Sequence, residues 1–188
     1  MGGRIRSRDR RGQIKGRIPI DQRPRIVEER SHIGDWEADT MIGKPGGPVL
    51  VTLAERKTRY SAIAKAPDKS ARAVTEALLA SLRPHASLVH TLTYDNGKEF
   101  SHHQVVAEVL NADGYFAHPC HSWERGLNEN TNGLIRQYLP KGTDFHSLTH
   151  AQVRSIMDRL NNRPRKCLGF KTPNQLFSEI NPPVALTS

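Results

Sequence analysis

Three stretches of the chain place carboxylates where local structure could hold them ready for chemistry. In the central one, Tyr94-Asp95-Asn96-Gly97-Lys98-Glu99-Phe100, an apolar, β-favouring run delivers Asp95 to a turn at Asn96-Gly97. A carboxylate at the end of a buried strand is held by a rigid element and faces solvent, as metal-dependent phosphoryl chemistry requires. Asp-Asn-Gly is also ordinary turn chemistry, so this motif by itself leaves a simple turn as the alternative.

The second stretch is a predicted strand, Ile33 to Ile42, which carries Asp35, Glu37 and Asp39 at alternate positions. Alternation places all three acids on one face of the strand. A row of acids is costly if it is buried without neutralisation. The face is therefore either solvated, or at least one of its acids meets a divalent cation. Strand alternation cannot choose which acid that is.

The third stretch is a predicted helix from Asn128 to Tyr138, with Glu129 in its first turn. The positive end of the helix dipole favours an ionised carboxylate there. Asn132 and Arg136 follow at positions +3 and +7, so the helix presents all three on one side. Carboxylate, amide and guanidinium in a row suit a metal next to a phosphate, although a capped, solvated helix would show the same pattern.

Acids on three separate elements fit a two-metal site. Two cations about 3.5–4 Å apart activate a nucleophile and stabilise the leaving oxygen of an in-line displacement. Hard oxygen ligands indicate two Mg²⁺ ions, with Mn²⁺ as a substitute.

Hydrophobic periodicity and turn signals predict the elements that must position these acids. Strands are predicted from Ile33 to Ile42, Val49 to Leu53, Tyr60 to Lys65, Leu88 to Tyr94 and Gly114 to Ala117. Helices are predicted around Val74 to Leu82, Val106 to Leu110 and Asn128 to Tyr138, after a capping box at Thr149 and Gln152, and from Thr172 to Ile180. This order predicts an α/β fold, a mixed five-stranded sheet with helices on both faces.

Charge indicates a polyanionic partner. The 188 residues hold 28 Lys and Arg against 19 Asp and Glu, a formal net charge of +9, and the positive charge is clustered. Residues 1–25 are predicted to be a basic, flexible arm, residues 26–180 a single domain and residues 181–188 a tail. Arg8, Arg10 and Arg11 of the arm are candidate DNA-binding residues.

The sequence argues against export and membrane insertion. The arginine-rich N-terminus lacks the apolar segment of a secretory signal, and no run of about 18 apolar residues exists. Cys120 and Cys167 do not form a disulfide framework, so a reducing, intracellular setting is expected. His118-Pro119-Cys120-His121 could suggest zinc, but three ligands within four residues are badly spaced for a tetrahedral site.

Several of these motifs together resemble the DDE transposases of bacterial insertion sequences, specifically the insertion-sequence thirty group, relatives of retroviral integrases. Thirty-three residues lie between Asp95 and Glu129, similar to the group's D(33)E pattern, and Arg136 supplies the basic residue seven positions later. The resemblance runs from about Ser7 to Ser178. It also rests on Ser7-Arg8-Asp9-Arg10-Arg11-Gly12, Gly34-Asp35-Trp36-Glu37-Ala38-Asp39, Trp123-Glu124-Arg125-Gly126-Leu127-Asn128-Glu129-Asn130, the run from Asn132 to Thr143, and Leu160-Asn161-Asn162-Arg163-Pro164-Arg165.

The resemblance implies an RNase H-like fold whose catalytic, metal-binding triad is Asp39, Asp95 and Glu129. Asp39 is chosen by the family's Trp-x-x-Asp pattern. It also implies phosphodiester hydrolysis at each transposon end, followed by attack of the freed 3′-OH on target DNA. Arg136 and Lys141 would contact DNA phosphates. The expected partners are transposon-end and target DNA and further copies of the chain, and the expected location is the bacterial cytoplasm, in the nucleoid through DNA.

One departure from the family pattern leaves other functions open. Transposases of this group carry a helix-turn-helix region ahead of the catalytic domain, which this sequence lacks, so it is expected to be an excised domain or a truncated reading frame. The alternatives are a DNA-binding remnant, inactive or inhibiting full-length transposase, and a generic RNase H-like nuclease.

Overall fold

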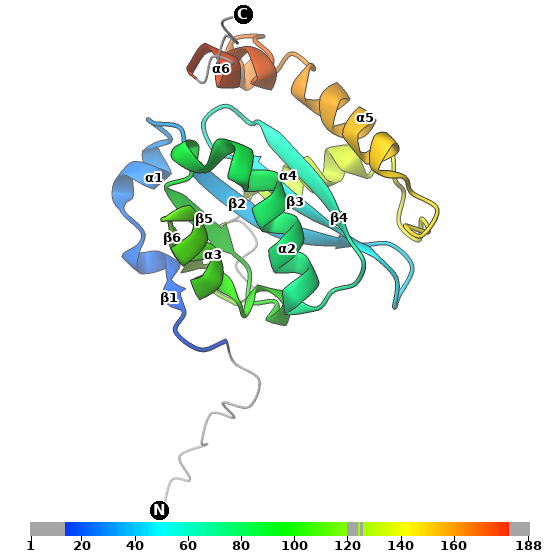
Figure 1. Cartoon of the computed structure of the whole chain (residues 1–188). Helices are drawn as coiled ribbons and strands as arrows, with labels where there is room; N and C mark the ends of the chain where they lie inside the picture. Colours follow the sequence, from blue (N-terminus) through cyan, green and yellow to red (C-terminus); the bar gives the residue numbers. More distant parts are fainter. Residues whose placement is uncertain (1–13, 120–123, 125, 181–188) are drawn as a thin grey trace, which may run out of the picture.

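The computed structural model describes residues 14–119, 124 and 126–180. Six strands form one mixed sheet in the order β1-β6-β5-β2-β3-β4 (Figure 1). The strands are β1 (Ile18–Pro19), β2 (Asp35–Ile42), β3 (Val49–Glu55), β4 (Ser61–Ala66), β5 (Thr91–Tyr94) and β6 (Asp113–Phe116). The helices are α1 (Arg25–Glu29), α2 (Ala71–Leu82), α3 (His103–Leu110), α4 (Gly126–Ile135), α5 (His150–Asn161) and α6 (Pro173–Ile180). Short 3-10 turns are η1 (Ile20–Gln22), η2 (Arg83–Leu88), η3 (Lys98–Phe100) and η5 (Lys166–Leu168).

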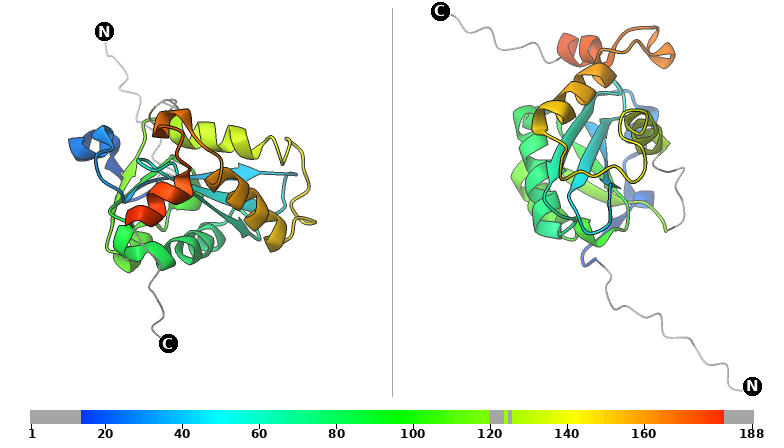
Figure 2. Two further views of the ribbon diagram at one scale, coloured as in Figure 1. Left: turned by 90° about the horizontal axis from the view of Figure 1, so that it is seen from above. Right: turned by 90° about the vertical axis from the view of Figure 1, so that its right-hand side faces the viewer.

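The sheet joins an antiparallel meander to a parallel half. β2, β3 and β4 pair antiparallel in sequence order, whereas β5 runs parallel to β2 and β6 runs parallel to β5. α2 and α3 cover one face and α4 covers the other (Figure 2). Each face has its own apolar cluster, one built around Trp36, Val74 and Leu92 and the other around Leu50, Ile135 and Leu160. The predicted α/β class, with helices on both faces, is confirmed.

The sheet has one strand more than the predicted five. β1 pairs parallel with β6, Ile18 lying opposite Tyr115. β1 belongs to the segment predicted to be a flexible arm over residues 1–25, but this segment packs on the fold from Ile14 onward. Ile14 is 8% exposed and Arg23 is 7% exposed. The high density of basic residues concealed the few apolar side chains that dock this segment; residues 1–13 lie outside the described part of the chain.

Helix starts follow the predicted capping chemistry. The Ser70 side chain accepts a hydrogen bond from the Ala73 amide at the start of α2. At α5, Thr149 and Gln152 form the complete capping box. α2 ends at Leu82, where the predicted helix also ends, and the 3-10 turn η2 follows it directly. No helix within the described ranges is long and apolar enough to cross a membrane.

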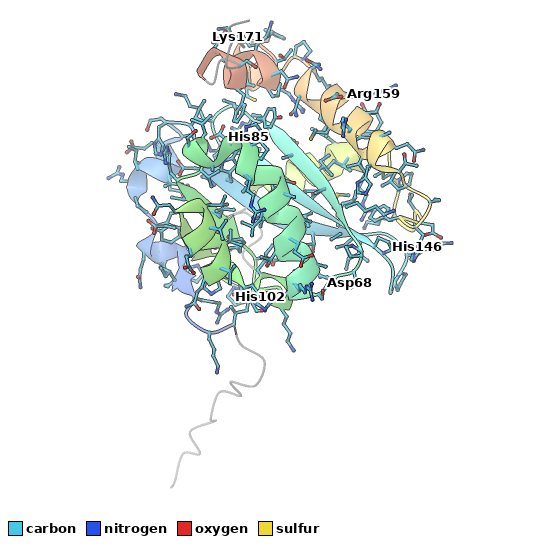
Figure 3. All side chains as sticks on the ribbon, in the orientation of Figure 1. Asp68, His85, His102, His146, Arg159 and Lys171 are labelled. Carbon is cyan, nitrogen blue, oxygen red and sulfur yellow. The ribbon has the colours of Figure 1, made fainter. Side chains whose placement is uncertain are left out.

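His85, labelled in Figure 3, makes the stability of the fold sensitive to acid. Its ring lies 5.8 Å from the Tyr60 ring and 5.1 Å from the Phe177 ring, centroid to centroid. Burial lowers the pKa of His85, so the unfolded chain takes up the proton at higher pH than the folded chain does. Folding is therefore favoured above the unfolded-state pKa, about 6.5, and loses stability as the pH falls below it.

We expect His85→Gln to weaken this acid dependence. Between pH 7 and 5, one proton can change the unfolding free energy by at most about 1.4 kcal/mol per pH unit. Denaturant unfolding at several pH values should show a shallower decline in His85→Gln than in the wild type. The matched control is His102→Gln, because His102 is exposed. Parallel pH profiles for His85→Gln and the wild type would contradict the assignment.

Candidate active site

Helix α4 lies along strand β2 in register with its acids. The backbone N–H of Asn128 donates to Glu37 Oε2 at 3.0 Å, and the side-chain Nδ2 of Asn132 donates to Asp39 Oδ2 at 3.0 Å. From Asn128 to Asn132 the helix rises about 6 Å, and from Glu37 to Asp39 the strand rises about 6.6 Å. Because the two rises are nearly equal, both hydrogen bonds can form at once. The strand's alternate acids therefore fix the position of the helix that carries Glu129.

Asp39 is partly buried and held in one orientation. Its Oδ1 accepts from the Thr40 amide at 2.8 Å while its Oδ2 accepts from Asn132. Asn132 in turn accepts from the Thr52 hydroxyl of β3 at 2.9 Å. The Asn132 side chain thus links Asp39 of β2 to β3 and to α4.

Asp95, directly after β5, follows the strand that runs parallel to β2, in whose middle Asp39 lies. The β2–β5 ladder pairs Glu37 with Thr93, and two further residues along each strand lead to Asp39 and Asp95. Hydrogen-bonded strands lie about 4.8 Å apart, so the two carboxylates start from adjacent backbone positions. Asp95 Oδ1 accepts from the Gly97 amide at 2.8 Å, which closes the turn predicted from the sequence.

Glu129 is exposed, one helical turn before Asn132. Across the described ranges, no three His, Cys, Asp or Glu side chains form a group that could hold a metal ion. Continuing the strand register thus brings Asp39 and Asp95 to neighbouring backbone positions, with Glu129 on the adjoining helix, and the three carboxylates are not gathered. The carboxylate oxygens of Asp39 and Asp95 are suitable donors for a hard divalent cation.

The other two acids of β2 are neither solvated nor available to a cation. Asp35 and Glu37 are fully buried. Asp35 Oδ1 accepts from the Thr91 hydroxyl at 2.6 Å, and Glu37 Oε1 pairs with Arg56 Nη1 at 2.6 Å. The sequence left open that this strand face is exposed to solvent. For these two residues that interpretation is wrong, because both are buried and their burial is compensated by hydrogen bonds and an arginine.

A buried polar network continues from Glu37 to the N-terminal segment. Arg56 also pairs with Glu28 of α1 at 3.1 Å, and Arg23 contacts Glu28 and donates to Thr93 at 2.7 Å. Burial, aided by the nearby Arg56 charge, lowers the pKa of Arg23 to about 10. Sequence reasoning missed these residues, since Arg56 lies 28 positions from Glu28 and Arg23 lies 70 positions from Thr93, distances that leave no local pattern.

The predicted DNA-binding residues lie in different surroundings. Arg136 donates to three backbone carbonyls, those of Ile42 at 2.9 Å, Leu139 at 3.3 Å and Pro140 at 3.4 Å. Its guanidinium therefore fastens the end of α4 to the end of β2. Lys141 is exposed in the following loop. Arg8, Arg10 and Arg11 lie outside the described residues.

His118, the first residue of the cluster considered for zinc, bonds to carboxylates. Its Nδ1 lies 2.9 Å from Glu124 Oε1, and its Nε2 lies 2.9 Å from Asp21 Oδ2. The hydrogen bond with Glu124 raises the pKa of His118. Cys120 and His121 lie outside the described residues.

Most of the chain is homologous to transposases of the IS30 group, although a search of protein-family models gives no match. It is 50% identical over 170 residues to the transposase for insertion sequence element IS4351 of Bacteroides fragilis, covering 90% of this chain and 52% of that protein. It is 39% identical over 170 residues to the transposase InsI for IS30A of Escherichia coli strain K12, covering 90% and 43%. The chain thus spans about half the length of these curated relatives.

Solved structures share the fold at low sequence identity. The catalytic core domain of BIV integrase matches with a TM-score of 0.58 and 17% identity, covering 78% of this chain and 95% of that one. A chain of the simian T-cell lymphotropic virus intasome in complex with PP2A regulatory subunit B56 gamma matches with a TM-score of 0.62 and 17% identity, covering 84% and 57%. The fold is therefore that of an integrase catalytic core, and the predicted RNase H-like fold is confirmed.

Proposed function

Since most of this chain is homologous to transposases of the IS30 group, we propose that it is the catalytic domain of an insertion-sequence transposase. Its reaction is phosphodiester hydrolysis at the ends of the element, followed by attack of the freed 3′-OH on target DNA. The observation that carries this proposal is the position of Asp39 within β2 next to the end of β5, where Asp95 follows, beside a helix that presents Glu129.

Divalent cations fit the donor set at this position. Asp39 and Asp95 would hold Mg²⁺, with Mn²⁺ as a substitute, and Glu129 would complete a second metal position. Bound there, the ions would activate the attacking oxygen and stabilise the leaving one in an in-line displacement. Asn132 and the Thr40 amide keep the Asp39 carboxylate oriented, and the Gly97 amide does the same for Asp95.

The proposed function also assigns partners and organisation. DNA, as element ends and as target, is the substrate, and further copies of the chain assemble on it. The catalytic core comprises residues 26–180 together with residues 14–25, whose β1 joins the same sheet, and residues 181–188 follow it. Arg136 and Lys141 contact DNA phosphates, and Arg8, Arg10 and Arg11 add to DNA affinity. The site of action is the bacterial cytoplasm, on nucleoid DNA.

A nicking and joining assay tests the proposal. Purified chain is incubated with supercoiled plasmid and labelled oligonucleotide duplexes, with Mg²⁺, Mn²⁺ or EDTA. We expect metal-dependent nicks and joining of labelled 3′ ends to the plasmid. DNA binding without nicking would instead support the inactive remnant. Cleavage of RNA–DNA hybrids without joining would support the generic nuclease.

Asn132 is expected to act as a positioning residue for Asp39. Residues that orient metal ligands typically contribute 10–100-fold to activity or metal affinity, so we expect Asn132→Ala to lower nicking by roughly that factor. More Mn²⁺ should be needed for half-maximal rate, which a purely structural loss would not produce. Gln137→Ala, at an exposed position on the same segment, is the matched control. Equal Mn²⁺ dependence in Asn132→Ala and the control would refute the role.

A further inference from the structure

Three arginines from separate parts of the chain line one cavity beside α4. Arg30 follows α1, Arg59 lies in the turn between β3 and β4, and Arg165 follows α5. The cavity measures about 260 Å³, and its remaining wall includes Asn130 and Thr131 of α4. None of the three arginines is among the residues for which the sequence or the family pattern predicted a role.

The cavity concentrates positive charge. Burial lowers the pKa of Arg30, and the charges of Arg59 and Arg56 add to the effect. Burial likewise lowers the pKa of Arg165, with repulsion from Arg163 and Arg59. Among the ion pairs between described residues, none joins Arg30, Arg59 or Arg165 to a carboxylate. A bound anion would therefore reduce the repulsion among these three guanidinium groups.

The backbone holds two of these arginines in an uncommon conformation. Arg30 has a φ of 50° and Arg59 a φ of 64°, in the left-handed region that residues with a side chain rarely adopt. The Arg59 turn is fixed by Glu55, whose Oε2 accepts from the amides of Lys57 and Thr58. Arg30 ends α1 in this conformation and Arg59 closes the turn after β3, so local structure fixes the backbone of both arginines.

We propose that this arginine-lined cavity binds a backbone phosphate of the DNA substrate, an inference that rests on the proposed function. Guanidinium groups match phosphate geometry and hydrogen-bond it in pairs. The amino-terminal turns of α4 add the positive end of a helix dipole.

The position of the cavity fits a DNA strand that continues past the reacting phosphodiester. In a helix with 3.6 residues per turn, Leu127, which lines the cavity, and Glu129 project from opposite flanks of α4. The cavity and the acidic site are thus separated by roughly one helix diameter, about 10–12 Å. A strand crossing the start of α4 would reach both.

The test is the salt dependence of DNA binding. Arg30→Asn and Arg59→Asn remove one charge each, and asparagine tolerates the left-handed conformation, so both variants should keep the fold. Arg83→Asn is the charge-matched control, because Arg83 is exposed and follows α2 on the other face of the sheet. Fluorescence anisotropy with a labelled 20-base-pair duplex, in EDTA and from 50 to 200 mM salt, gives the slope of log K against log salt.

Each phosphate contact contributes about −0.9 to that slope. We expect Arg30→Asn and Arg59→Asn to reduce its magnitude by about one relative to Arg83→Asn and to weaken binding several-fold at 50 mM salt. Slopes equal to that of Arg83→Asn, in variants that melt like the wild type, would overturn the inference while leaving the proposed function intact. Absence of DNA binding by the wild-type chain would overturn both, and metal-dependent nicking independently tests the proposed function.

Discussion

Asp95→Asn is expected to abolish DNA nicking and strand joining while leaving the fold unchanged. Metal ions typically contribute several kcal/mol to the transition state, and each 1.36 kcal/mol is a factor of ten in rate. Loss of a charged metal ligand should therefore lower the rate by a factor on the order of 10³ or more. The fold should survive because the asparagine oxygen can still accept from the Gly97 amide, and asparagine favours this turn.

The matched control for Asp95→Asn is Asp113→Asn. Asp113 is exposed and begins β6, so it lies at the amino end of the parallel strands, away from Asp39 and Asp95. Both variants lose one negative charge, but only Asp95→Asn should lose metal-dependent conversion of supercoiled plasmid to the nicked form. Circular dichroism and melting would verify that both are folded. Nicking by Asp95→Asn within tenfold of the wild type would mean that the carboxylate is not part of the catalytic site.

Removal of the Glu37 carboxylate should give the largest loss of stability. Glu37 and Arg56 are both almost completely buried, and Glu37 also accepts from the Asn128 amide. Breaking a buried ion pair by removing one partner typically costs 3–5 kcal/mol, because the other charge is left uncompensated. We expect Glu37→Ala to lower the unfolding free energy by about that amount in urea titrations.

Two further variants test whether the stability loss comes from breaking the Glu37–Arg56 ion pair. Glu76→Ala breaks the exposed Arg72–Glu76 pair of α2, and exposed pairs of this kind contribute little to stability because solvent screens them. Glu37→Ala combined with Arg56→Met removes both buried charges and should recover part of the lost stability. If Glu37→Ala costs no more than Glu76→Ala, Glu37 does not stabilise the fold through Arg56.

Glu37 has a second expected effect, on catalysis. Its carboxylate fixes the first turn of α4, so its loss should also misplace Glu129. At temperatures where Glu37→Ala remains folded, we therefore expect slower metal-dependent nicking than in Glu76→Ala.

Local patterns predicted most of the sheet and its helices. Alternation indicated β2, an apolar run indicated β3, helical periodicity indicated α2 and a capping box located the start of α5, because these signals depend on neighbouring residues. β1 escaped detection because its two residues lie in a basic segment and are held by pairing with β6, about 97 residues away. Charge density in that segment was an unreliable guide to flexibility.

The site was predictable only in part. The end of a strand followed by a turn singled out Asp95, and family resemblance chose Asp39 among three alternate acids. In the structure, Asp35 and Glu37 are fully buried and bonded inside the protein, whereas Asp39 is the partly exposed acid of the three. The Arg56 pairing and the arginine-lined cavity join residues that are distant in sequence, so no local pattern could reveal them.

Metal location by crystallography tests the central claim most directly. Crystals soaked in Mn²⁺ and measured by anomalous scattering should show an ion between the carboxylates of Asp39 and Asp95, with Glu129 turned toward a second position. The same soak of Asp95→Asn crystals should lose that peak. Mn²⁺ bound at other residues, with the Asp39 and Asp95 carboxylates turned apart, would contradict a metal-dependent active site between the middle of β2 and the end of β5.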